Sequence, residues 1–206
     1  MRPPRRLIAM PALVSGLLVS GLLVFGLAIA SSASASLILA LDLPTLVARA
    51  DQISVVDVVS VKASWNEDHD RIVTTVDLAV VDCWKGSAAP ASHVQVVQPG
   101  GTVAELTMRV DGMPRFSPGE RALLFLRFSR DRPGRASVVG MGQGKRPVQR
   151  EAGTGRWMVS APDRAGADFV TTTPASGAVF TARARPLADL KSEIHALAAG
   201  ASGGAR

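Results

Sequence analysis

Apolar and polar positions alternate through the middle of the chain. In residues 71–84 one face is mostly apolar, with Ile72, Val76, Leu78 and Val80, and the opposite face includes the polar residues Arg71, Thr75 and Asp77. Residues 53–61 alternate in the same way, with Asp57 as the exception. A period of two is the pattern of a strand with one buried and one solvated face. Because the short polar loop 66–70 joins the two runs, the pattern predicts a hairpin.

Further short strands are expected at residues 94–96, 104–110, 122–126 and 138–141. Pro-Gly sequences at residues 98–101, 117–120 and 132–135 separate them, because proline presets φ for a turn and glycine accepts a positive φ. Residues 122–126 are apolar on both faces. That composition is typical of a central strand covered from each side.

Helical spacing of apolar residues appears near the two ends of this region. Residues 43–51 predict a short helix, in which Pro44 suits the first turn. Residues 186–199 predict an amphipathic helix that ends at Gly200, with its apolar face formed by Leu187, Leu190, Ile194 and Leu197. Between these helices, residues 157–159 and 178–180 are further short strand candidates.

Together these elements predict a mainly β fold. We expect a small OB-like antiparallel barrel over residues 36–150 with a short N-terminal helix. An irregular extension over residues 151–200 carries the C-terminal helix, and residues 201–206 form a disordered tail. A β-sandwich is the alternative. The barrel is preferred because closure removes the exposed sheet edges that a chain without disulfides must otherwise protect.

The first 35 residues have the pattern of a signal peptide. Arg2, Arg5 and Arg6 precede a 24-residue stretch without charge, residues 7–30, and Ala33-Ser34-Ala35 fits a peptidase cleavage site. Export to the periplasm or the extracellular space is therefore expected. The apolar stretch is also long enough to span a bilayer. An uncleaved anchor that holds the protein to the inner membrane through residues 7–30 is thus the alternative.

Composition limits the possible partners of the exported part. The whole chain has a net charge of +6, but without the three leader arginines 20 basic residues face 17 acidic ones, a net charge of +3. With six Phe, three Trp and no Tyr for base stacking, we expect no nucleic acid partner. We also expect no cofactor. Cys83 is the single cysteine, so an intramolecular disulfide is excluded.

Two clusters are candidate binding sites. The most concentrated basic region could contact an anionic envelope polymer, a membrane surface or another protein; it comprises Arg127, Arg130, Arg132 and Arg135, with Lys145 and Arg146. In the polar loop, Glu67, Asp68 and Asp70 could ligate a hard cation, although the loop lacks the glycine and distal glutamate of a known calcium loop. The glycine-rich residues 140–146 match neither a phosphate loop nor a dinucleotide fingerprint.

Four motifs occur in a fixed order: Leu43-Pro44-x-Leu46-Val47-x-x-Ala50-Asp51, Trp84-Lys85-Gly86, Phe116-x-Pro118-Gly119-Glu120-Arg121-x-Leu123-Leu124-Phe125-Leu126, and Val139-Gly140-x-x-Gln143-Gly144-Lys145. Over about residues 43–150 the chain resembles a family of uncharacterised exported bacterial proteins, which carries no established activity. Its strand order also resembles the OB-type barrel of netrin-like domains, which include the tissue inhibitors of metalloproteinases. Those inhibitors use an amino-terminal cysteine and several disulfides, and this chain has neither.

The functional expectation is a non-catalytic exported binding or interaction module of the bacterial cell envelope. No catalytic residue is assigned, because no HExxH, CxxC, GxSxG or SxxK sequence occurs. One alternative is a cell-envelope hydrolase that uses Cys83 or a loop carboxylate. The other alternative is a membrane-tethered envelope protein.

Overall fold

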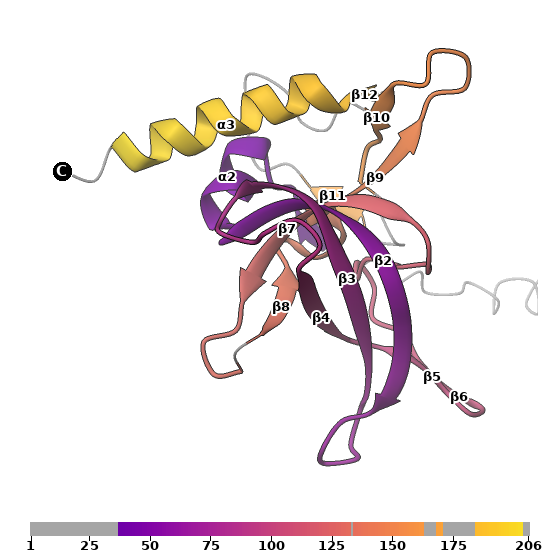
Figure 1. Cartoon of the computed structure of the whole chain (residues 1–206). Helices are drawn as coiled ribbons and strands as arrows, with labels where there is room; N and C mark the ends of the chain where they lie inside the picture. The colour runs from indigo at the N-terminus through magenta and orange to yellow at the C-terminus, as the bar shows by residue number, and fades with distance from the viewer. Residues whose placement is uncertain (1–36, 133, 163–167, 171–183, 204–206) are drawn as a thin grey trace, which may run out of the picture. The chain divides into compact units, whose positions relative to one another are not determined.

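The computed structural model describes residues 37–132, 134–162, 168–170 and 184–203 (Figure 1). The elements in chain order are β1 (Leu37–Leu39), α2 (Leu43–Arg49), β2 (Gln52–Trp65), β3 (Ile72–Lys85), β4 (His93–Pro99), β5 (Gly101–Val103), β6 (Leu106–Met108), β7 (Arg121–Phe128), β8 (Arg135–Val138), the 3-10 helix η1 (Met141–Gly144), β9 (Lys145–Arg150), β10 (Trp157–Val159), β11 (Asp168–Val170), β12 (Arg185–Pro186) and α3 (Leu187–Gly203). The fold is mainly β, as predicted. No helix in the described ranges is long and apolar enough to cross a membrane. The expected leader lies outside them.

Five strands of the main sheet close into a ring. Their order is β7-β2-β3-β4-β8, and β8 pairs back onto β7. The pairing of β4 with β8 is parallel and the other four are antiparallel. The expectation of a purely antiparallel barrel is therefore wrong in this one pairing. Closure agrees with the barrel interpretation better than with the sandwich alternative. Beyond the ring, β9, β10 and β12 extend the sheet from the other half of β7.

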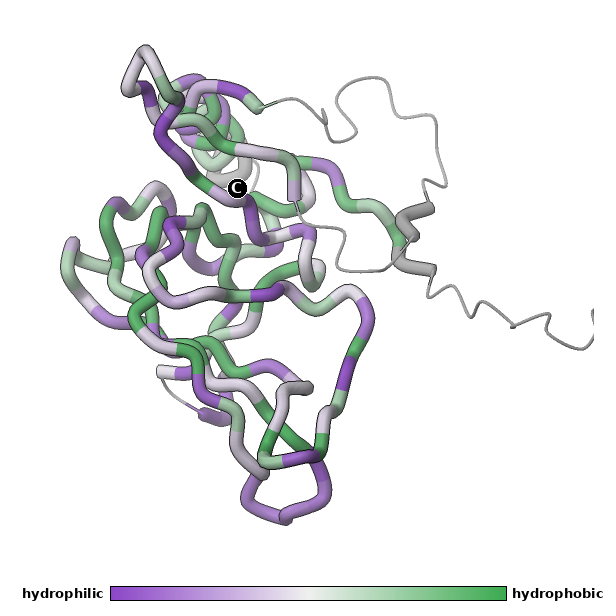
Figure 2. The backbone as a smooth tube through the Cα atoms, turned by 90° about the vertical axis from the view of Figure 1, so that its right-hand side faces the viewer, coloured by the Kyte–Doolittle hydropathy of each residue, from purple (hydrophilic) through white to green (hydrophobic). Residues whose placement is uncertain are grey.

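The core lies on both sides of β7. Leu123 and Phe125 face a cluster that includes both helices, whereas Ala122, Leu124 and Leu126 face a second cluster inside the ring. All five side chains are fully buried, which confirms the prediction of a strand covered on each side. The hydropathy view shows green segments gathered in the body and a purple, hydrophilic tip at the end of the β2–β3 hairpin (Figure 2).

Both helices are fixed by specific contacts. The side chain of Asp42 caps α2, because its Oδ1 accepts a hydrogen bond from Thr45 N at 2.9 Å. At the other end Lys85 Nζ donates to the carbonyls of Val47 and Ala50, each at 2.7 Å, which satisfies carbonyls that the helix leaves unpaired. α3 buries Leu190 and Ile194 completely against this cluster.

Some expected elements differ in the structure. Residues 104–110 do not form one strand, because Ala104 has a φ of 50° in the turn of the small β5–β6 hairpin. The strand expected at 138–141 ends at Val138, and η1 and the unpredicted strand β9 follow. α3 continues through Gly200 to Gly203, so Gly200 does not end the helix and the tail expected from 201 is helical at its start. The strand candidate at 178–180 lies outside the described residues.

Candidate functional site

The basic hairpin predicted from the sequence exists as an exposed feature. Arg127, Arg130 and Arg132 are exposed on and beyond the end of β7, and Arg135 begins β8 half-buried. A concave site of about 570 Å³ lies here, lined by Asp51, Arg127, Phe128, Ser129, Arg130 and Asp131. Because two carboxylates share this site with two of the arginines, its positive charge is partly compensated.

Lys145 and Arg146 do not add exposed charge to that hairpin. Lys145 is only 4% exposed. Its Nζ lies 2.6 Å from Glu120 Oε1 and 4.8 Å from the Phe116 ring centroid, and it donates to the carbonyl of Arg115. Burial, and after it the nearby charge of Arg185, lowers the pKa of Arg146 to about 10, although the charge of Glu193 opposes this shift. Lys145 therefore offers no exposed charge beside the hairpin arginines, and its neighbour Arg146 in β9 is half-buried.

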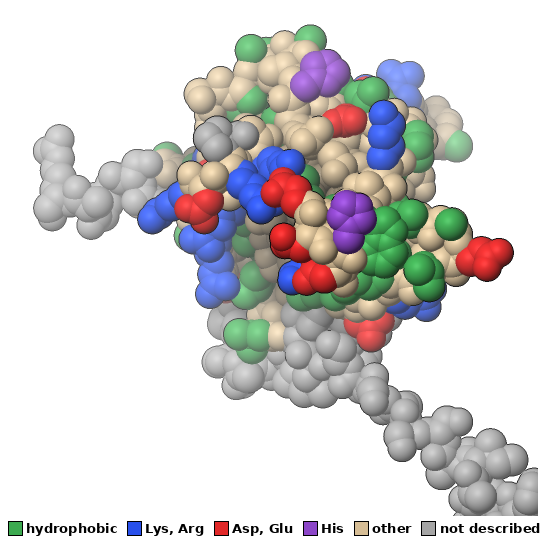
Figure 3. Space-filling model, turned by 90° about the horizontal axis from the view of Figure 1, so that it is seen from below, with side chains coloured by type: hydrophobic (Ala, Val, Ile, Leu, Met, Phe, Trp, Pro, Cys, Tyr) green, Lys and Arg blue, Asp and Glu red, His purple; other side chains and the backbone are tan. Residues whose placement is uncertain are grey.

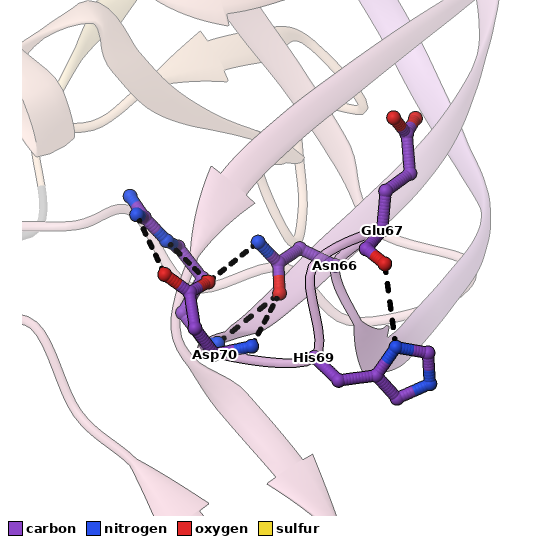
Figure 4. A network of polar contacts seen from close by, with 5 residues as sticks. Asn66, Glu67, His69 and Asp70 are labelled. Carbon is purple, nitrogen blue, oxygen red and sulfur yellow. Dashed lines mark hydrogen bonds and ion pairs between the residues drawn. The ribbon is translucent and has the colours of Figure 1, made fainter.

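The acidic loop is an internally bonded turn. Asn66 Nδ2 donates to Asp70 Oδ1 at 2.7 Å, and Asn66 Oδ1 accepts from the backbone N–H groups of Asp70 and Arg71 (Figure 4). The hydrogen bonds from Arg71 and then Asn66 lower the pKa of Asp70. His69 Nδ1 lies 3.3 Å from the carbonyl oxygen of Glu67. Within the described residues no three metal-ligating side chains converge, so Glu67, Asp68 and Asp70 are not brought together as a ligand set.

Cys83 lies near the end of β3 and is half-buried. Its Sγ donates to the carbonyl of Lys85 at 3.2 Å. In the part of the chain that the structure describes, no histidine or carboxylate hydrogen-bonds to this thiol. The hydrolase alternative therefore lacks a hydrogen-bonded base at Cys83.

The glycine-rich segment after β8 packs backbone against backbone. Gln143 is fully buried, and its amide accepts from Leu41 N at 2.7 Å and donates to the carbonyl of Leu39 at 3.0 Å. A Cβ at Gly144 would stand 2.3 Å from the carbonyl oxygen of Val139. These motif residues thus hold the start of the described chain in place. The segment is not a phosphate loop, as the sequence indicates.

A different concave site lies where the outer parts of β2, β3 and β4 meet the segment after β5. We call it the Met–Arg groove; its volume is about 420 Å³. It is lined by Val61, Thr74, Gln98, Pro99, Gly100, Gly101, Thr102, Thr107, Met108, Arg109, Val110, Met113, Pro114, Arg115, Phe116 and Ser117. The apolar lining residues are half-buried for the most part, while Arg109 and Arg115 are exposed.

The outer wall of the Met–Arg groove is held by hydrogen bonds from three elements, β4, β9 and η1. Gln98 Nε2 donates to the carbonyl of Pro114 at 2.8 Å, Lys145 donates to the carbonyl of Arg115, and Gly142 N donates to the carbonyl of Gly112 at 2.7 Å. Hydrogen bonds of this kind fix a loop that carries no regular structure of its own. The path of this outer wall is therefore set by contacts within the protein itself.

A second groove, of about 340 Å³, lies between α3 and the sheet, with Trp84 and Trp157 in its lining. Cations already cover these indoles: Arg121 lies 4.6 Å and Arg150 5.3 Å from the Trp157 ring centroid, and Lys191 lies 5.9 Å from that of Trp84. Such contacts stabilise the packing of charged side chains on tryptophan. The contacts in this groove therefore serve mainly to hold α3 against the sheet, and the tryptophan rings offer little free surface on which a ligand could stack.

Lys191 Nζ also lies 2.6 Å from Asp82 Oδ2 beside the second groove. Burial raises the pKa of Asp82, but hydrogen bonds from Lys191 and Trp84 outweigh that effect and lower it. The carboxylate is therefore charged and already satisfied by side chains of the protein itself.

Apolar side chains are also exposed at the ends of two hairpins. Seen from below, hydrophobic atoms gather beside a histidine and several acidic side chains (Figure 3). Trp65 at the end of β2 is 37% exposed, and Leu106 in β6 is 59% exposed. The described structure shows nothing that covers them.

Sequence reasoning missed the Met–Arg groove. The sequence places Arg109 only within the strand expected at 104–110, and Arg115 lies outside every predicted element. Their proximity depends on how residues 98–117 fold back over the sheet, and no local pattern encodes that path. Comparison with protein-family models, with curated proteins and with solved structures finds no match for this chain.

Proposed function

We propose that this protein is a non-catalytic exported binding module of the bacterial cell envelope, and that the Met–Arg groove is its binding site. The observation that supports this proposal is a concave site of about 420 Å³ that joins apolar side chains to two exposed arginines. Small-molecule sites in proteins are typically concave, mostly apolar and largely formed before the ligand arrives.

The fixed outer wall strengthens this proposal. A loop held by Gln98, Lys145 and Gly142 loses little conformational entropy when a ligand binds. Rigid placement of a loop that carries exposed side chains is also the usual way in which small β proteins present a binding surface. The loop therefore contributes affinity without first having to be ordered.

The ligand itself can be recovered directly. The purified protein is incubated with an extract of bacterial envelopes, re-isolated, and its bound small molecules are identified by mass spectrometry. Thr107→Trp places a large side chain in the lining of the groove and should abolish retention of the compound. Ser137→Trp, at an exposed position on β8, is the matched control and should retain it. Equal retention by both variants would place the binding site elsewhere.

Export rests on the leader pattern of residues 1–35. Amino-terminal sequencing of the protein from the envelope fraction should find Ser36 as its first residue. A protein that still carries residues 1–35 and sediments with membranes would instead support the membrane-tethered alternative. The length of the apolar stretch 7–30 favours that alternative.

A further inference from the structure

We infer that the ligand of the Met–Arg groove is a monomeric anionic amphiphile, in which a carboxylate or phosphate head group is joined to one apolar chain. This inference rests on the proposed function, because it names the chemical class of ligand for the same groove. It follows from the separation of charge and apolar surface within the lining.

The charge of the groove selects an anionic head group. Arg109 and Arg115 are exposed, and among the described residues that line the groove none carries a carboxylate. Lys145 lies behind the outer wall of the groove, but its charge is already neutralised by Glu120, whose Oε1 lies 2.6 Å from Nζ. Two guanidinium groups therefore supply the net charge. Guanidinium binds carboxylate and phosphate oxygens in a bidentate manner, which makes arginine well suited to such head groups.

The apolar part of the lining suits a flexible apolar chain. Five half-buried apolar side chains from β2, β6 and the segment after β6 line the groove: Val61, Met108, Val110, Met113 and Phe116. Two of them are methionines, whose unbranched side chains adapt to irregular apolar ligands. Covering these side chains with a hydrocarbon chain removes apolar surface of both partners from water, which favours binding by about 25 cal/mol per Å².

A sugar ring fits this lining less well. Phe116 is the one aromatic residue among the described lining residues, and its ring already lies 4.8 Å from the ammonium of Lys145. The concave shape also favours one molecule over an extended bilayer surface. The chemistry of the groove therefore points to a single amphiphile.

The test is isothermal titration of the purified protein with dodecyl phosphate below its critical micelle concentration. We expect saturable binding to one site. Arg109→Gln and Arg115→Gln should each weaken binding about tenfold. This factor is the low end of the range for the loss of a hydrogen bond to a charged group, because both arginines are exposed at the rim of the groove. Arg127→Gln removes the same charge from the basic hairpin and is the control; it should change affinity by less than about twofold. An uncharged dodecyl glycoside should bind at least about tenfold more weakly than dodecyl phosphate.

Three results would overturn the inference. One is the lack of saturable binding of dodecyl phosphate. Another is equal weakening by Arg127→Gln, which would mean that net charge governs binding. The third is binding to phosphatidylglycerol vesicles without binding of the monomer, which would identify a membrane surface as the partner. If Thr107→Trp still abolishes retention of an envelope compound of another class, the proposed function stands and only the ligand class is wrong.

Discussion

The ion pair between Lys145 and Glu120 gives the sharpest prediction about stability. The two side chains differ in exposure: that of Lys145 is 5% exposed and that of Glu120 is 28% exposed. A buried charge that loses its partner must either stay unpaired or recruit water. Because the Glu120 side chain is partly exposed, although its Oε1 is buried, whereas the Lys145 side chain is almost fully buried, removing the acid should cost more than removing the base.

The expected magnitudes follow from that asymmetry. Glu120→Gln leaves a buried ammonium held only by the Arg115 carbonyl and the Phe116 ring, and should lower the free energy of unfolding by about 3 kcal/mol. Lys145→Met keeps the apolar stem, leaves a carboxylate that water can solvate, and should cost about 1 kcal/mol. The double variant should cost about 2 kcal/mol, less than the sum, because neither charge then remains.

Urea unfolding followed by circular dichroism measures all three values. A change in the urea midpoint at an unchanged slope reports stability itself. If Lys145→Met costs more than Glu120→Gln, or if the two costs simply add in the double variant, the ion pair does not control the stability of this region and the reasoning fails.

Three further changes test the fold. Gly144→Ala should lower the free energy of unfolding by more than about 2 kcal/mol, because the new Cβ would meet a backbone carbonyl. The control is Gly200→Ala in α3, where the added Cβ has open space. In the same urea titration it should be neutral or stabilise the protein by about 0.5 kcal/mol. The hydrogen bond from Arg121 lowers the pKa of Asp57, so the carboxylate stabilises the fold above its unfolded pKa and this contribution is lost as the pH falls through its folded pKa. Asp57→Asn should therefore flatten the loss of stability measured between about pH 5 and pH 2, and an unchanged acid profile would contradict the assignment. Gln143→Ala leaves the buried backbone N–H of Leu41 unpaired and should lower the free energy of unfolding by about 2 kcal/mol, with faster hydrogen exchange at the Leu41 N–H. Unchanged exchange there would mean that Gln143 does not hold the first strand region.

Local pattern was sufficient for most strands of the ring. The hairpin of β2 and β3 followed from its period of two, and β7 followed from a run that is apolar on both faces. These signals are local because side-chain direction alternates along any strand. Residues 104–110 misled the same reasoning. Their alternation is real, but the positive φ of Ala104 turns the chain back on itself. A strand pattern does not reveal such a turn.

The candidate site could be predicted only in part. Arg127, Arg130 and Arg132 are close in sequence, so their shared hairpin was predictable. The burial of Lys145 was not predictable, because spacing along the chain does not show which side chains are buried in ion pairs. Glu120 is 25 positions away in sequence and yet neutralises Lys145. Long-range partners of this kind decide which charges remain exposed.

The sequence by itself determined the mainly β class, the positions of β2, β3, β4, β7 and β10, and the two helices, because alternation, helical spacing and turn residues are short-range properties of the chain. Only the tertiary structure decided that β8 pairs in parallel with β4 to close the ring. It also decided that Gln143 hydrogen-bonds to the backbone of Leu41, and that Arg109 and Arg115 line the same groove. Each of these contacts joins segments whose separation in the sequence carries no periodic signal, so they arise from packing of the whole chain.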